Sequence, residues 1–282
     1  MSKSTRPGVM SSMQVVRVRE GRARETIDDV ATEEPLEIRI IAAGRTTSVA
    51  VTMRTPGNDF ELAAGFLFSE GIIASRDAVR TITYCVDPHI DVQQQYNIVN
   101  VALDLPALPN LERLERHFTI NSSCGVCGKA SIDALTTRAD PLGDQMRIPL
   151  RTIEHLPASM QKAQRVFAST GGLHACALFD ADGKLLALRE DVGRHNAFDK
   201  IVGWALLENR IPLERHIALV SGRASFELVQ KAVLARIPIV CAVSAPSSLA
   251  VEVATEFGLT LVGFVREARA NVYAGRQRIV FP

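Results

Sequence analysis

Two cysteines separated by two residues are the most reactive feature of the sequence. Cys124 and Cys127 lie in the segment SSCGVCGK, where flanking glycines predict a pliable loop. The thiolate is the nucleophilic form of cysteine, and a helix N-terminus after the loop, with Lys129 nearby, lowers the pKa of such a thiol. The first cysteine of such a pair is usually the exposed one. We therefore expect Cys124 to attack and to carry a persulfide, with Cys127 as a helper or resolving thiol.

Other uses of this pair remain open: a redox disulfide, half of a zinc site, or two idle thiols. Zinc needs two further ligands, but Cys85, Cys176 and Cys241 lie in apolar stretches, where cysteine is usually a small buried hydrophobe. A redox motif is expected between a strand and a helix of a thioredoxin-like unit, and the preceding HFTINSS matches that poorly. We expect no bound zinc or other metal.

A second polar group, EDVGRHNAFDK, spans residues 190–200 between a predicted strand and a predicted helix. His195 and Asp199 are four residues apart, so on a helix they share a face and the aspartate could fix the imidazole tautomer. The alternative is an ordinary polar helix start, with Asp191 as its cap and the remaining charges solvated. Spacing alone does not choose between them.

Two serine-containing loops each follow a predicted parallel strand and open a helix. The first contains Ser221, Gly222 and Arg223, and the second covers residues 244–248. Free backbone N–H groups at such helix starts, with hydroxyls and an arginine, suit phosphate oxygens. Simple N-capping by Ser225 and Ser247 would need no ligand. Neither loop has the pattern of a nucleoside triphosphatase.

The last long predicted strand reaches the same rim of the sheet, where open sheets bind ligands. It ends in a run that could hold a nucleotide: Phe264 could stack on a base, and Arg266 or Arg269 could meet phosphate. The alternative for Phe264 is a place in the core. The candidate run is Phe264, Val265, Arg266, Glu267, Ala268 and Arg269.

Periodic apolar positions predict the elements that hold these groups. Among them are a hairpin over 35–54, a following helix capped by Asn58 or Asp59, and a helix over 157–170. A length of 282 residues favours two compact units. We predict a disordered or extended tail over 1–30, a small α+β domain over 31–115, a connector with the CxxC loop over 116–150, and an α/β domain over 151–282. In the last, one antiparallel hairpin precedes repeated strand–helix–strand crossovers, which predicts a mixed sheet with helices on both faces.

Charge and hydropathy limit the partners and the location. The 32 basic and 31 acidic residues nearly cancel, which disfavours a nucleic-acid binder. No apolar run approaches the roughly 18 residues that span a membrane, and no secretory leader is recognisable, so we expect a cytoplasmic protein without a membrane partner. The first 24 residues are rich in arginine, as transit peptides and disordered tails both are, and we favour a tail.

Taken together, these segments resemble the FdhD/NarQ family of formate dehydrogenase accessory sulfurtransferases. The resemblance runs in family order from about Asp59 to Tyr273. The matching segments are DFELAAGFLFSEGII, SSCGVCGK, EDVGRHNAFDK, SGRASFELVQKA, SAPSSLAVEVA and GLTLVGFVREARANVY. Each segment alone is weak evidence for the family, but the set in this order is specific for it.

The resemblance implies a homodimer whose C-terminal half is a cytidine-deaminase-like three-layer α/β/α domain beside a smaller N-terminal α+β domain. It also implies a sulfurtransferase: a cysteine desulfurase loads sulfur onto Cys124, and the acceptor is a molybdenum bis(molybdopterin guanine dinucleotide) cofactor destined for formate dehydrogenase. Residues 264–269 look like part of the cofactor-binding strand end. Ser221, Gly222, Arg223 and His195 are our own additions to that site.

The resemblance to deaminases does not extend to their zinc site. Zinc deaminases carry HxE on one helix and PCxxC later in the chain. Here His195-Asn196-Ala197 stands at the first place, SGRASF stands at the second, and the CxxC pair lies upstream of both. A deaminase is therefore disfavoured, and the alternative that remains is a non-catalytic chaperone that only holds the cofactor or the apoenzyme.

Overall fold

The computed structural model describes residues 7–109, 111, 135–143 and 146–282. Its larger part is built on a six-stranded sheet in the order β13-β12-β11-β10-β8-β9. The strands are β8 (His174–Asp180), β9 (Leu185–Asp191), β10 (His216–Val220), β11 (Ile239–Ala242), β12 (Thr260–Arg266) and β13 (Arg269–Ala274). The three central strands β10, β11 and β12 are parallel, and the outer pairings are antiparallel. The predicted mixed sheet is confirmed, with β13 as an edge strand that we did not predict.

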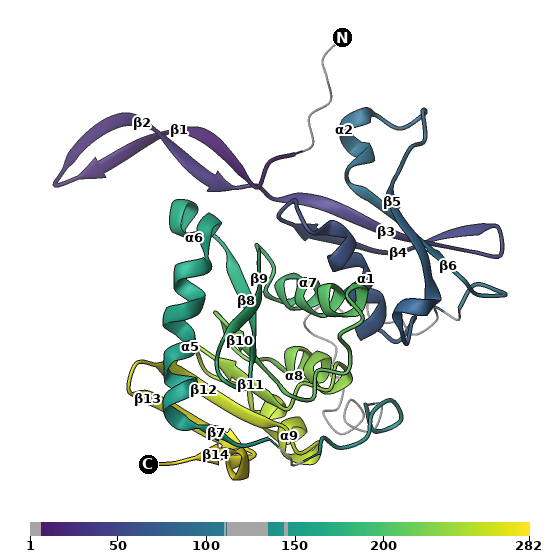
Figure 1. The fold of residues 1–282 in the computed structure, drawn as a ribbon. Helices are drawn as coiled ribbons and strands as arrows, with labels where there is room; N and C mark the ends of the chain where they lie inside the picture. The colour runs from purple at the N-terminus through teal and green to yellow at the C-terminus, as the bar shows by residue number, and fades with distance from the viewer. Residues whose placement is uncertain (1–6, 110, 112–134, 144–145) are drawn as a thin grey trace.

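Helices cover both faces of this sheet (Figure 1). One face packs against α7 (Arg194–Leu207), α8 (Phe226–Leu234) and α9 (Ser248–Glu256), and the other against α5 (Leu150–Ala163). Each interface is a separate buried apolar cluster, because side chains of successive strand residues point to opposite faces. The predicted three-layer α/β class is confirmed.

The helix on the second face differs from the prediction of one helix over 157–170. It begins earlier, at Leu150, and contains Pro157. It ends at Ala163, and α6 (Arg165–Thr170) follows after Gln164, whose ψ of 86° interrupts the helix. The C-terminus adds η2 (Arg276–Arg278) and β14 (Ile279–Val280), which pairs with β7 (Ile148–Pro149).

The smaller part is a four-stranded sheet in the order β4-β3-β6-β5 with one helix against it. It contains β3 (Glu34–Ala42), β4 (Arg45–Arg54), α1 (Asp59–Ser69), η1 (Arg76–Ala78), β5 (Val79–Tyr84), α2 (Val92–Gln95) and β6 (Ile98–Leu103). The predicted hairpin over β3 and β4 is confirmed. Alternate residues of β3 are buried, as the alternating sequence requires.

Helices α1 and α7 join the two parts at a close crossing. Gly65 of α1 and Gly203 of α7 face each other's backbone: a Cβ at Gly65 would lie 1.9 Å from the carbonyl oxygen of Asp199, and one at Gly203 would lie 1.8 Å from that of Glu61. Only glycine permits this approach, since real Cβ contacts are never under 3.0 Å.

The N-terminal region differs from the expected disordered or extended tail. Strands β1 (Met10–Arg19) and β2 (Arg22–Ala31) form an antiparallel hairpin that projects from the body (Figure 1). Its two-residue turn, Glu20 and Gly21, has φ values of 51° and 74°, the left-handed conformation that tight hairpins need. We call residues 10–31 the arm.

No helix in the described ranges is both long enough and apolar enough to cross a membrane.

Candidate functional site

A cavity of about 710 Å³ opens at the rim of the large sheet where β10 and β12 end. Four of the predicted site residues line it: Ser221, Val265, Arg266 and Glu267. The rest of its wall comes from α5, from α6 with the turn that follows it, from the first residue of β8 and from Val243 after β11; these residues are Pro157, Ala158, Met160, Gln161, Gln164, Phe167, Gly171, Gly172, Leu173, His174 and Val243. The volume lies within the range of small-molecule sites.

Sheet pairing holds the two polar corners of this cavity together. Strand β8 runs antiparallel to β10, so the start of one lies beside the end of the other. The backbone N–H of Ala175 donates to Ser221 Oγ at 2.9 Å, and the N–H of Ser221 donates to the Ala175 carbonyl at 2.9 Å. Gly222 lies against the ring of His174: a Cβ there would be 3.3 Å from Nδ1.

His174 also lines this cavity, although we did not predict it as a site residue. Burial lowers the pKa of its imidazole, and the positive charges of Arg194 and His195 add to this effect. Its ring is therefore neutral at pH 7 and can accept or donate a hydrogen bond in the cavity. The signal was available in principle, because the first residue of an antiparallel strand lies at the rim where its parallel neighbours end.

The wall formed by α6 is fixed by a carboxylate. Glu190 accepts hydrogen bonds from the N–H groups of Val166 at 3.1 Å and Phe167 at 2.7 Å. A carboxylate at a helix start satisfies donors that have no partner within the helix. Because Glu190 belongs to β9, this contact ties the cavity wall to the sheet.

The two serine loops are linked to each other. Ala224 forms an isolated parallel bridge with Pro246, and the N–H of Ser247 donates to the Ala224 carbonyl at 3.0 Å. Ser247 accepts from the Ala250 N–H at 3.3 Å, so its capping role is confirmed. The Ser225 hydroxyl makes no cap and lies 3.2 Å from Nε2 of His195.

The pairing of His195 with Asp199, one of the two alternatives for this segment, is not what the structure shows. His195 Nε2 lies 2.6 Å from Glu227 Oε2, and hydrogen bonding to His195 lowers the pKa of that carboxyl. Asp199 instead accepts from Lys231 Nζ at 2.7 Å and from Ser69 Oγ at 2.9 Å. The shared-face argument placed Asp199 correctly on α7, but its carboxylate is bonded to the ammonium group of Lys231 on α8, a charged donor.

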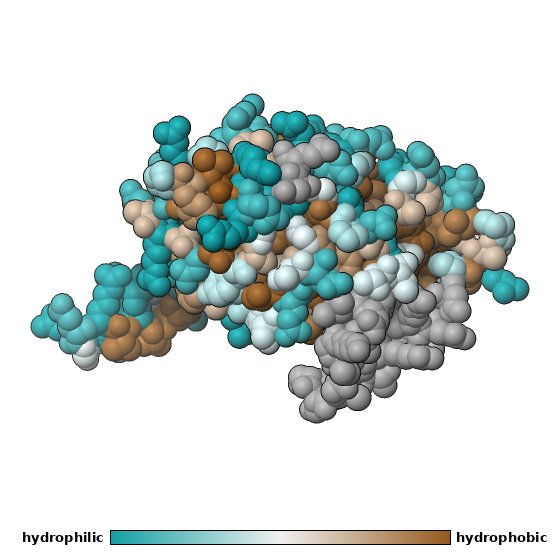
Figure 2. Space-filling model, turned by 90° about the horizontal axis from the view of Figure 1, so that it is seen from below, coloured by the Kyte–Doolittle hydropathy of each residue, from teal (hydrophilic) through white to brown (hydrophobic). Residues whose placement is uncertain are grey.

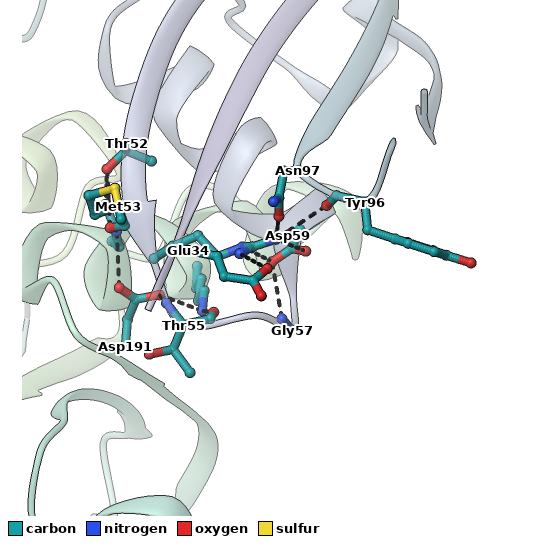
Figure 3. A network of polar contacts seen from close by, with 12 residues as sticks. Glu34, Thr52, Met53, Thr55, Gly57, Asp59, Tyr96, Asn97 and Asp191 are labelled. Atoms are coloured by element: carbon teal, nitrogen blue, oxygen red, sulfur yellow. Dashed lines mark hydrogen bonds and ion pairs between the residues drawn. The ribbon is translucent and has the colours of Figure 1, made fainter. Parts of the chain in front are cut away.

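The alternative of a solvated helix start at residues 190–200 is also wrong for two of its charges. Asp191 and Lys200 are fully buried and lie 2.6 Å apart. Asp191 also accepts from the N–H of Thr55 at 3.2 Å (Figure 3). It accepts further from the N–H of Gly193 at 2.8 Å and from Asn196 Nδ2 at 3.0 Å. Because Thr55 follows β4, one buried carboxylate ties the smaller part of the chain to the start of α7.

A second buried ion pair lies on the far side of Thr55. Arg54 is fully buried, and its Nε lies 3.2 Å from Asp59 Oδ1 at the start of α1. Its guanidinium also donates to the Asn97 Oδ1 at 3.0 Å and the Tyr96 carbonyl at 3.2 Å (Figure 3). Asn58, which we considered as a side-chain cap of α1, has a φ of 56° and makes no such bond.

The remaining predicted residues lie beside the cavity. Phe264 has a φ of 54° and donates its N–H to the Ser244 carbonyl at 3.2 Å. Its ring centroid lies 5.8 Å from the guanidinium carbon of Arg269, a cation–π distance. Ala268 sits in the tight turn to β13 with a φ of 56°, and Arg223 is exposed. Of residues 264–269, Val265, Arg266 and Glu267 contribute to the cavity wall.

Cys124 and Cys127 lie outside the described residues. The other three cysteines are buried, as predicted, and burial raises the pKa of the Cys176 and Cys241 thiols, so both are inert. Across the described ranges, no group of three or more histidine, cysteine, aspartate or glutamate side chains could hold a metal ion.

Comparisons with known proteins agree on one family. Residues 31–280 match the model of the FdhD/NarQ family. A sulfur carrier protein FdhD of Mycolicibacterium paratuberculosis is 50% identical over 96% of this chain and 99% of its own, and one of Streptomyces avermitilis is 51% identical over 96% of each. A crystal structure of a putative formate dehydrogenase accessory protein from Desulfotalea psychrophila has a TM-score of 0.75 and 27% identity, covering 97% of this chain and all of that one.

Proposed function

The chain belongs to the FdhD/NarQ family, and we propose that it is a sulfur carrier that transfers persulfide sulfur to a molybdenum cofactor destined for formate dehydrogenase. The observation that carries this proposal is the cavity at the sheet rim, which gathers Ser221, Arg266 and the unpredicted His174 in a chain whose relatives are named sulfur carriers.

The proposed chemistry begins at Cys124. Its thiolate attacks the terminal sulfur of a persulfide on a cysteine desulfurase; a new S–S bond forms at Cys124, the old one breaks, and the desulfurase cysteine leaves as a thiolate. Cys127 then acts as the resolving thiol. Its attack on Cys124 Sγ forms a disulfide and releases the outer sulfur as hydrosulfide. The two electrons that reduce this sulfur come from the Cys124 and Cys127 thiols, which are oxidised to the disulfide.

The substrate that receives the sulfur is a molybdenum bis(molybdopterin guanine dinucleotide) complex, and the cavity suits one guanine nucleotide end of it. Arg266 lines the wall and offers a positive charge to a diphosphate. Neutral His174 and Ser221 supply hydrogen-bonding groups for a base or ribose.

The competing function is a chaperone that holds the cofactor without chemistry, and Cys124→Ala separates the two. We expect this variant to fold and to bind nucleotide but to abolish formate dehydrogenase maturation, while Cys127→Ala gives a milder loss where an external thiol resolves the persulfide. Mass spectrometry after incubation with a desulfurase and cysteine should find one added sulfur on Cys124. Normal formate dehydrogenase maturation by Cys124→Ala would remove the sulfur-transfer mechanism and favour the chaperone function.

The nucleotide site has its own test. Calorimetry should show GDP binding roughly tenfold or more tightly than ADP, because adenine would leave hydrogen-bonding groups for the guanine edge unpaired, at about 1–3 kcal/mol each. Arg266→Ala should weaken both nucleotides, and Arg45→Ala, an exposed arginine on β4 outside the cavity, should weaken neither. Equal affinities for GDP and ADP would remove the guanine site and leave the Cys124 chemistry standing.

A further inference from the structure

The arm has two chemically different faces. In an antiparallel pair, directly opposed residues share a face. One face carries Val16, Val18 and Ile27, which are between 61% and 70% exposed, together with the acidic Glu25 and Asp29. Toward the tip, the opposite face carries two directly opposed arginine pairs, Arg17 with Arg24 and Arg19 with Arg22. Figure 2 shows the arm projecting on the left, with hydrophilic and hydrophobic residues on different sides.

The arginine face is unfavourable for the isolated chain. Like charges directly opposed across two strands destabilise the pairing. Arg17 has one acidic neighbour, Asp28 at 3.1 Å, but for the other three no ion pair is found within the described part of the chain. A lone two-stranded hairpin is itself marginal in water. Residues 10–31 also contain Glu20, Glu25, Asp28 and Asp29, so the arm as a whole is neutral. Glu25 and Asp29 lie on the opposite face, so the positive charge is confined to the arginine face.

The base of the arm borders the cavity. The Ala31 methyl group at the end of β2 packs against Gly172, which lines the cavity, and β2 contacts α6, whose Phe167 also lines it. Ser11 Oγ and Thr32 Oγ1 lie 2.8 Å apart and close the base of the hairpin. A protein that contacts the base of the arm therefore also borders the cavity.

We propose that the arginine face of the arm, formed by Arg17, Arg19, Arg22 and Arg24, docks an acidic surface of the formate dehydrogenase that receives the cofactor. The charge of the face selects an acidic partner. The choice of the recipient rests on the proposed function, because the base of the arm borders the cavity in which that function places the cofactor. A nucleic acid is disfavoured, since residues 10–31 contain no aromatic side chain for base stacking. A second copy would have to bring like charges together in any symmetric contact of these faces.

Charge reversal tests the docking surface on the full-length protein. We would measure binding to purified cofactor-free formate dehydrogenase by biolayer interferometry at 50 and 150 mM salt. Arg19→Glu with Arg22→Glu should lower the affinity at least roughly tenfold and reduce its salt dependence. The matched control is Arg45→Glu with Arg80→Glu, which makes the same charge change at exposed strand positions of the body and should stay within about twofold of wild type.

Three results would overturn the proposal. The first is unchanged affinity of the arm variant. The second is a changed oligomeric state of that variant in light scattering, which would assign the face to a second copy. The third is arm-dependent binding of phosphatidylglycerol vesicles with no arm-dependent binding of the dehydrogenase. Persulfide loading of Cys124 by a desulfurase is measured separately and should be unchanged in the arm variant, so a failure of the sulfur chemistry would be distinguishable from a failure of docking.

Discussion

Gly203→Ala probes the crossing that holds the two parts of the chain together. A methyl group at residue 203 would lie 1.8 Å from the Glu61 carbonyl oxygen, whereas ordinary contact begins at 3.4 Å. The obstacle is helix backbone, which no side-chain rotation can move, so α1 and α7 must separate. The buried residues beside the crossing, including Leu62 and Leu206, would lose contact as they do.

The expected cost lies at the upper end of the range for overpacked cores, about 3 kcal/mol of unfolding free energy or more. The sign of the stability change is informative. Alanine is a better helix former than glycine by up to about 1 kcal/mol, so helix propensity alone would make the variant more stable. With a urea m-value of about 3 kcal/mol/M, the unfolding midpoint should fall by about 1 M. Circular dichroism during urea titration measures it.

Two further variants sharpen this test. In Gly65→Ala with Gly203→Ala, the second methyl group should cost less than it does alone, since the first has already separated the helices. Gly143→Ala is the control: a Cβ there meets no atom within 4 Å, and its effect should be within about 0.5 kcal/mol. A Gly203→Ala protein as stable as wild type, or more stable, would refute the crossing.

The other predictions concern buried and half-buried charges. Asp191→Asn should destabilise the chain by about 3–5 kcal/mol in urea titrations, because the buried Lys200 ammonium loses its counter-charge, and adding Lys200→Met should recover much of that loss. Equal stability of the single and double variants would show that Asp191 and Lys200 are not energetically coupled. His174 has a folded pKa below its usual 6.5, so the unfolded chain binds its proton more readily, and stability should fall as the pH drops through 6.5 toward the folded value. His174→Gln should flatten that part of the pH profile, and an unaltered slope would show that His174 is not its source.

Much of the architecture was readable from local pattern. The alternation in β3 and the strand–helix spacing after residue 173 are regular patterns of apolar positions along the chain. Such patterns predict the type of each element without knowledge of how the elements pack. The hairpin of β3 and β4, the order of the crossovers and the meeting of Ser221 with Arg266 at one rim followed directly. Parallel strands bring their carboxyl ends to the same edge, so the position of a loop on that edge required no knowledge of packing.

The N-terminal arm was not readable in this way. An arginine-rich segment without buried positions resembles a disordered tail in composition. Its strands face solvent on both sides, so their sequence lacks the alternation of buried apolar residues that would predict a strand. The turn at Glu20-Gly21 was the available signal, and it has meaning only once the two flanking segments are known to pair.

What the sequence by itself determined was therefore the fold class, the family and the rim at which Ser221 and Arg266 meet. Tertiary structure alone decided which charges pair. His195 and Asp199 share a helix face, yet each has its partner on α8, and Asp191 is not a solvated cap but a buried anchor for Thr55, 136 residues away in the chain. The physical reason is that charge pairing depends on distances between elements, which are set by helix crossings such as that of Gly65 and Gly203, and no spacing within one element encodes them.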